Sequence, residues 1–158
     1  MAKEKKKPKV EITYRKASHE YHFINEFDAG IMLTGTEVKS IRSGNANLSD
    51  AYCAFENGEL WIRNLYVAEY EFGTDANHSP RRQRKLLLKK PELRKLERGI
   101  KEKGTTIIPY KLFLSERGLI KLTVCLSRGK KMYDKRESIK NRESKRELDR
   151  VNKAYNVR

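Results

Sequence analysis

The strongest constraint on the fold is a pair of strand-like runs joined by an Asn-Gly turn. The run AYCAF alternates in the manner of a strand, Asn57-Gly58 supplies the turn, and LWIRNLYVAEY returns as the partner. Asn-Gly is the strongest short-range hairpin signal, because both residues tolerate positive φ. The sequence therefore predicts a β-hairpin over Asp50 to Tyr70, and hence an antiparallel sheet.

Other segments supply further strands. Residues 105–115 (TTIIPYKLFLS) and 118–127 (GLIKLTVCLS) predict a second hairpin across the turn Glu116-Arg117-Gly118. Val10 to Thr13 alternates as a short first strand, and Tyr21 to Leu33 mixes aromatic and β-branched residues as a long one. Asp28-Ala29-Gly30 is predicted to bend or bulge that long strand.

Two helices interrupt the strands. Thr34 or Thr36 can cap a short helix that Gly44 closes, and Pro91 opens a helix from about residue 90 to Lys103. Between them, Gly73 to Arg84 has the composition of a long functional loop. The following KLLLKK is compatible with a buried strand or with the start of the helix.

Five or six strands joined by short turns favour a small antiparallel barrel over a parallel α/β sheet. We therefore predict an all-β fold with added helices, a six-stranded barrel of the oligonucleotide-binding (OB) type. With 158 residues, the chain is the size of one domain. The predicted division is a flexible basic arm over 1–9, the barrel over 10–128 and a basic tail over 129–158.

The net charge of +15 is unevenly distributed. Lys3 to Lys16, Arg81 to Lys103 and Gly129 to Arg158 together carry +19, which leaves the other residues at −4. Clustered positive charge beside a mildly acidic body indicates a phosphate-backbone partner. A protein bound to a membrane surface is the competing interpretation, but no apolar run approaches the roughly 20 residues of a span.

The tail has too few apolar residues to form a core. Leu148, Val151 and Tyr155 nevertheless recur at helical spacing. Segments of this composition tend to be disordered alone and to order on a polyanion. We predict a tail that is disordered when free and helical on its partner.

The N-terminus predicts the cellular compartment, and the two cysteines predict the redox state of the protein. The basic N-terminus has no apolar run behind it, so no secretory signal is predicted and the protein is expected in the cytoplasm. Cys53 and Cys125 lie far apart in apolar strands and are predicted to be reduced core thiols.

No catalytic motif stands out. His19, His22 and His78 form no ligand set, and no nucleophile motif or phosphate-binding glycine loop occurs. We therefore predict no enzyme activity, no metal and no cofactor. Two alternatives remain open: a Mg²⁺-dependent RNA-cleaving enzyme that uses Asp28, Glu37 or Asp50, and a structural protein of the ribosomal type held by its basic ends.

Signals for nucleic-acid binding are stronger. A basic group lies where the long loop meets the next element, where Arg can pair with phosphates: Arg81, Arg82, Arg84 and Lys85. Rings at the start of the long strand suit stacking on unpaired bases: His19, Tyr21, His22 and Phe23. The segment Gly129 to Arg136 places charges around a single aromatic residue directly after the last strand.

Several segments together resemble the small protein B (SmpB) family, in order and with matching spacing from about His19 to Arg136. They are GIMLTGTEVKSIRSGNANLSDAY (30–52), NGELWIRN (57–64), RKLLLKKPELRKL (84–96), KGTTIIPYKLFLSERGLIKL (103–122) and GKKMYDKR (129–136). The resemblance implies a monomeric RNA-binding adaptor without membrane association. Its implied partners are the tRNA-like domain of transfer-messenger RNA (tmRNA) and the small ribosomal subunit with its rRNA. The implied function is trans-translation, the rescue of stalled ribosomes.

The resemblance also implies roles for individual residues. Asp28 and Leu87 match RNA-contacting positions. The decoding-centre motif matches Gly129, Lys130, Lys131, Asp134, Lys135 and Arg136, with the tail entering the vacant mRNA channel as a helix. The family often has Asn in place of Tyr14 and His in place of Tyr133, so stacking is the expected role of Tyr133.

Overall fold

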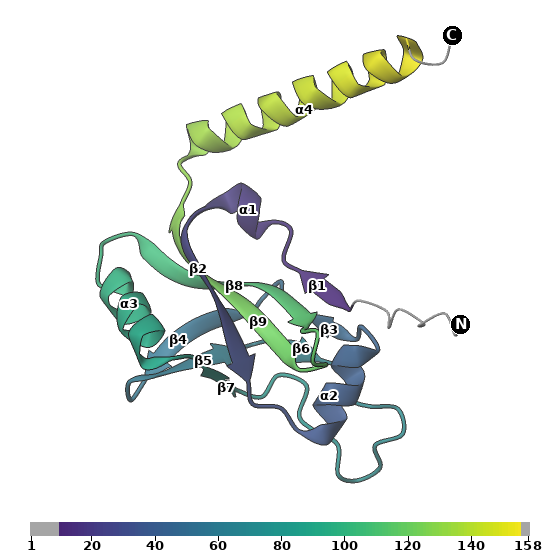
Figure 1. The fold of residues 1–158 in the computed structure, drawn as a ribbon, viewed down its shortest axis with the longest axis vertical. Coiled ribbons are helices and arrows are strands. Elements are labelled where there is room, and N and C mark those ends of the chain that lie inside the picture. Colours follow the sequence, from purple (N-terminus) through teal and green to yellow (C-terminus); the bar gives the residue numbers. More distant parts are fainter. Residues whose placement is uncertain (1–9, 156–158) are drawn as a thin grey trace.

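The computed structural model describes residues 10–155, so the predicted flexible arm of residues 1–9 lies outside the described residues. Strands are the main regular structure of the body, with short helices at its edges (Figure 1). The strands are β1 (Glu11–Thr13), β2 (Tyr21–Ile31), β3 (Ala46–Asn47), β4 (Tyr52–Glu56), β5 (Glu59–Arg63), β6 (Tyr66–Val67), β7 (Arg84–Leu87), β8 (Thr105–Leu114) and β9 (Ile120–Gly129). The helices are α1 (Ala17–Glu20), α2 (Gly35–Arg42), α3 (Lys90–Ile100) and α4 (Met132–Tyr155).

One antiparallel sheet of seven strands organises the body, in the order β1-β8-β9-β2-β7-β5-β4, and β3 pairs with β6 in a separate two-stranded sheet. The predicted mainly-β class with helices is confirmed, but the count of six strands is wrong. One cause is the run 60–70, which the sequence pattern treats as one strand. It breaks after Arg63, because Asn64 adopts a φ of 57° and β6 then pairs with β3.

Both predicted hairpins form. Glu56 pairs with Glu59 across Asn57 and Gly58, whose φ values of 51° and 75° match the tight turn that Asn-Gly favours. In the β8–β9 hairpin, Leu114 pairs with Ile120. The ambiguous KLLLKK segment (85–90) contributes its first three residues to strand β7, and only its last residue, Lys90, belongs to α3.

The predicted bulge lies elsewhere in β2. Pairing between β2 and β9 is continuous from Asn25 to Gly30, whereas the register shifts between Phe23 and Asn25. The extra residue, Ile24, is exposed to solvent. Gly30 allows β2 and β7 to pack closely instead, because a Cβ there would lie only 3.3 Å from the Cβ of Leu87 on β7.

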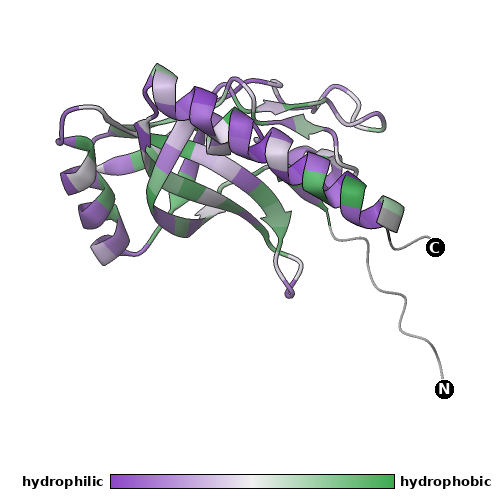
Figure 2. Ribbon diagram, turned by 90° about the horizontal axis from the view of Figure 1, so that it is seen from above, coloured by the Kyte–Doolittle hydropathy of each residue, from purple (hydrophilic) through white to green (hydrophobic). Residues whose placement is uncertain are grey.

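The three longer helices differ in how they begin and in where they lie. Helix α2 starts with a hydrogen bond from the Thr34 backbone N–H to Glu37 Oε2 (2.8 Å), and α3 has Pro91 in its first turn, as predicted. Helix α3 ends at Ile100, three residues before the predicted end. Helix α4 projects away from the body, and most of its residues are hydrophilic (Figures 1 and 2).

The core lies between the curled sheet and the inner faces of α2 and α3. Its fully buried members include Ile41 of α2, Leu96 of α3, and Leu60, Leu112 and Leu122 of the sheet. No helix within residues 10–155 is long and apolar enough to cross a membrane.

Cys53 and Cys125 are both free and buried, as predicted. Burial raises the pKa of both thiols, that of Cys125 to about 12, so the reactive thiolate is scarce at neutral pH. We expect a thiol reagent at pH 8 to label neither cysteine rapidly in the native protein and to label both once denaturant is added. Prompt labelling of either thiol in native buffer would contradict this burial.

Candidate RNA-binding surfaces

A buried carboxylate fixes the basic junction before β7. Arg82 donates from Nε to Glu37 Oε1 (2.7 Å) and from Nη2 to Oε2 (2.6 Å), and Arg84 Nε also donates to Oε1 (2.7 Å). Burial raises the pKa of Glu37, but the hydrogen bonds from Arg82, Thr34 and Arg84 outweigh it and hold the pKa below its usual value. Glu37 is therefore charged, and its ion pairs with Arg82 and Arg84 link α2 to the segment that leads into β7.

Arg84, which the sequence predicts to contact RNA, has no exposed side-chain surface in the folded protein. Its remaining donors reach the carbonyl oxygens of Leu65 (2.7 Å), Arg82 (2.9 Å) and Pro80 (3.3 Å). Burial lowers the pKa of the guanidinium, although Glu37 opposes that effect. Through these hydrogen bonds, the buried side chain of Arg84 anchors the end of the long loop before β7.

The other three basic residues of this junction differ in accessibility. Arg82 keeps about a third of its side chain exposed (33%) beside Glu37. Lys85 forms an ion pair with Glu59 across β5 and β7. Arg81 is the most accessible, with 55% of its side chain exposed, and it lies over the Tyr66 ring at 5.7 Å. Of the four, Arg81 is best placed to meet a phosphate.

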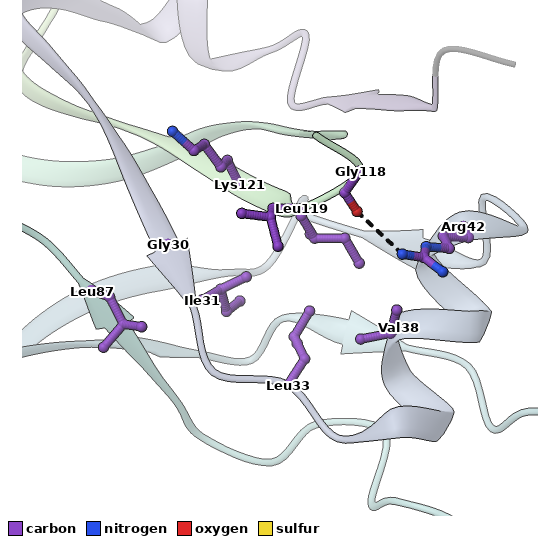
Figure 3. A pocket seen from close by; sticks show the side chains of 10 residues that line it. Gly30, Ile31, Leu33, Val38, Arg42, Leu87, Gly118, Leu119 and Lys121 are labelled. Atoms are coloured by element: carbon purple, nitrogen blue, oxygen red, sulfur yellow. Dashed lines mark hydrogen bonds between the residues drawn. The ribbon is translucent and has the colours of Figure 1, made fainter. Parts of the chain in front are cut away.

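Asp28 and Leu87 lie on neighbouring grooves. A cavity of about 340 Å³ runs between Leu87, Val38 and Leu119, with Lys121 and Arg42 at its rim (Figure 3). Arg42 Nη2 closes one end by donating to the Gly118 carbonyl (3.1 Å). Asp28 lines the adjoining groove, which shares Leu119 and Lys121 with the first. Thr123 Oγ1 donates to Asp28 Oδ1 (2.7 Å) and orients the carboxylate.

The sequence pattern did not point to Leu119 and Lys121. Leu119 is an exposed apolar residue directly after the predicted hairpin turn, which is the only local signal for it. The pairing of β9 with β2 brings both residues to the groove, since Lys121 pairs with Gly30 of β2.

The metal-dependent alternative finds no geometric support. Among residues 10–155, no three His, Cys, Asp or Glu side chains gather at metal-binding distance. Glu37 is already bound by two arginines, and Asp50 lies 3.8 Å from Arg81.

A second group of predicted residues lies at the other end of β2, beside the start of the tail. Tyr21 pairs with Gly129 and His22 with Arg128. Asp28 is seven residues further along the strand, about 23 Å away. The structure therefore separates His19, Tyr21 and His22 from Asp28 and Leu87. Phe23 packs at 4.9 Å against Tyr110, edge to face.

Contacts with α1 fix the point where the tail leaves the body. The Lys130 backbone N–H donates to the Glu20 carbonyl (2.8 Å), and its Nζ donates to the Ser18 carbonyl (3.0 Å). His19 Nδ1 lies 3.3 Å from Ser138 Oγ, within the second turn of α4. Short helix α1 was not predicted, because its four residues carry no periodic signal.

The first turn of α4 combines a cap with exposed contact residues. The Lys131 N–H donates to Asp134 Oδ2 (3.3 Å), and this carboxylate also suits the positive end of the helix dipole. Tyr133 (64% exposed) and Arg136 point into solvent, while Lys135 is partly covered. Nearer the sheet, Tyr14 donates to Glu20 (3.4 Å), and burial together with the Glu20 charge raises its pKa.

These features define a class. A curled antiparallel sheet with apolar and charged grooves, from which a long cationic helix projects, is suited to a polyanionic RNA partner rather than to a small substrate.

The particular family follows from comparison with known proteins. Residues 11–154 match the family model described as "SmpB protein". The SsrA-binding protein of Phocaeicola vulgatus is 56% identical over 142 residues, which cover 90% of this chain and 95% of that protein. That of Desulforamulus reducens is 48% identical over 137 residues, covering 87% and 85%. This chain belongs to the SmpB family.

A solved structure is also similar to this chain. A chain from work described as "tmRNA-SmpB: a journey to the center of the bacterial ribosome" superposes with a TM-score of 0.65 at 44% identity. The match covers 84% of this chain and 94% of that chain.

Proposed function

We propose that this protein is an RNA-binding adaptor, which binds the tRNA-like domain of tmRNA and delivers it to stalled ribosomes for trans-translation. Its relatives are named SsrA-binding proteins, and the similar solved chain comes from a tmRNA-SmpB study of the ribosome. One observation carries the proposal: a long, exposed cationic helix leaves the sheet at an end distinct from the grooves around Asp28 and Leu87. One molecule can therefore bind two RNA partners at once.

The two ends have different tasks in this proposal. The groove with Asp28, Leu87 and Lys121 receives the tRNA-like domain, where an apolar side chain contacts a base or ribose and the lysine a phosphate. The segment from Gly129 to Arg136 contacts the decoding centre, and the rest of the tail follows the vacant mRNA channel. His19, Tyr21, His22 and Arg81 add RNA contacts at the edges of these surfaces.

We also propose that the body closes into an OB-type barrel. Edge strand β4 approaches β8 from the other side of the curled sheet, which supports an OB-type barrel over residues 10–128. The tail, residues 129–158, makes contacts with the body through Lys130 and Ser138. Helix α4 is formed over Met132–Tyr155 in the structure, but residues 139–154, beyond Ser138, are exposed. In this proposal that part unfolds readily in the free protein and becomes stably helical on the ribosome.

The adaptor acts without chemistry of its own, as a monomer in the cytoplasm, where ribosomes are. Incubation with labelled RNA in Mg²⁺, with and without chelator, separates this from the nuclease alternative. Cleavage that chelator removes and that Asp28→Ala abolishes would favour the enzyme.

Leu87→Ala should weaken binding to an isolated tRNA-like fragment by roughly 5- to 30-fold, because an exposed apolar contact at the centre of an interface is lost. Leu148→Ala is the matched control, since Leu148 is similarly exposed but lies on the tail. Fluorescence anisotropy at fixed salt measures both. Equal affinities for wild type and Leu87→Ala would remove this groove from the RNA interface.

A further inference from the structure

The loop between β6 and β7 presents an aromatic side chain that none of the surfaces above uses. Phe72 is 77% exposed, the most exposed large hydrophobic residue in the described chain. Its ring lies 5.6 Å from that of Tyr70, edge to face. The loop lies beside α2, at the end of the body opposite α4 (Figure 1). We call residues 68–80 the acidic loop.

The acidic loop is held in place by its own polar groups. Asn77 accepts from the Tyr70 N–H (3.1 Å) and donates to the carbonyls of Tyr70 (2.9 Å) and Gly73 (2.8 Å). The next residue, His78, is buried and bonded to Thr36 Oγ1 (2.9 Å) and the Val67 carbonyl (3.1 Å). Phe72 is thus displayed by a preorganised loop, which reduces the entropy lost when a partner binds.

The charge of the acidic loop opposes that of the rest of the chain. Glu69, Glu71 and Asp75 are exposed, and residues 68–80 contain no Lys or Arg in a protein of net charge +15. Within residues 10–155, none of the three carboxylates forms an ion pair. The nearby Lys39 lies over the Tyr70 ring at 5.1 Å. Three uncompensated carboxylates repel a phosphate backbone and attract a basic protein surface.

We propose that the acidic loop is a docking site for a basic protein of the stalled ribosomal complex. Phe72 inserts into an apolar pocket on that protein, and Lys or Arg residues around the pocket pair with Glu69, Glu71 and Asp75. An aromatic anchor inside a ring of complementary charge is the arrangement that concentrates binding energy at protein interfaces. The inference rests on the proposed function, which brings this protein to stalled ribosomes.

Photo-crosslinking from position 72 tests the inference. Full-length protein carrying Phe72→p-benzoylphenylalanine is added to purified stalled ribosomes with tmRNA and irradiated. The expected product is one adduct to a ribosomal protein, which resists ribonuclease and is lost on protease treatment. No adduct, an adduct sensitive to ribonuclease, or an adduct to a second copy of the chain would each overturn the inference.

Affinity measurements with the same ribosomes provide a second readout. Phe72→Ala should weaken binding by roughly 5- to 30-fold, and Glu71→Lys should weaken it as well. The matched control is Tyr52→Ala, which removes an exposed aromatic residue outside the loop. Tighter binding by Glu71→Lys would identify an RNA partner and overturn the inference. Binding of the tRNA-like fragment by the wild-type protein is measured in parallel. If the wild-type protein fails to bind the fragment, the proposed function is refuted; if it binds the fragment but gives no protein adduct, only this inference is refuted.

Discussion

Glu37→Gln should lower the free energy of unfolding by about 3–5 kcal/mol, because it removes the charge that compensates a buried guanidinium. Arg84 has no exposed side-chain surface, and its Nε donates to Glu37 at 2.7 Å. Glutamine is nearly the same size, so the loss reports on charge rather than on a cavity. Urea denaturation followed by far-UV circular dichroism measures it.

A pH series sharpens this prediction. The folded pKa of Glu37 is below its usual value, so its contribution to stability is complete above the unfolded pKa and is lost as pH falls through the folded pKa. The difference between wild type and Glu37→Gln should therefore shrink in acid. Glu56→Gln is the control, because Glu56 pairs with Arg63 in a solvent-exposed ion pair worth less than about 1 kcal/mol. A Glu37→Gln effect as small as that of Glu56→Gln would contradict the role assigned to the buried cluster.

Deleting residues 132–158 should abolish peptide tagging on stalled ribosomes while leaving fragment affinity within about tenfold of wild type. Exposed charges more than about 8 Å from the bound fragment are largely screened at physiological salt. The deletion keeps β9 and the Lys130 contacts with α1 intact. Loss of fragment affinity beyond that range would make the tail part of the primary RNA site.

A charge-reversal variant tests whether tagging requires the positive charge of the tail and not only its length. Lys135→Glu combined with Arg136→Glu should also abolish tagging, because it places carboxylates in the segment that the proposed function brings to rRNA. Glu143→Gln on the same helix should leave tagging intact. Normal tagging by the double variant would contradict the role of this segment at the decoding centre.

Features of the fold with local causes could be predicted from the sequence. Asn57-Gly58 and Pro91 act through the dihedral angles of their own backbone, so the hairpin turn and the start of α3 follow directly. The bulge at Ile24 and the break after Arg63 depend on which strand lies opposite, which no local pattern contains.

The same distinction between local and long-range causes applies to the residues of the candidate site. Basic clusters and the motif after Gly129 are visible in the sequence because charge is a property of composition. The burial of Arg84 is not, because it depends on Glu37, which is 47 residues away in the chain. Likewise, the separation of His19 from Asp28 is set by the length of β2, and the approach of Leu119 to Leu87 by the pairing of three strands.

The central claim is tested most directly by peptide tagging in a reconstituted translation system that lacks any other SmpB protein. Ribosomes translate an mRNA without a stop codon in the presence of aminoacylated tmRNA, and the tagged nascent peptide is quantified. We expect tagging only when this protein is added, in proportion to the amount supplied. Tagging at the same level without the protein, or none in its presence, would contradict the adaptor function.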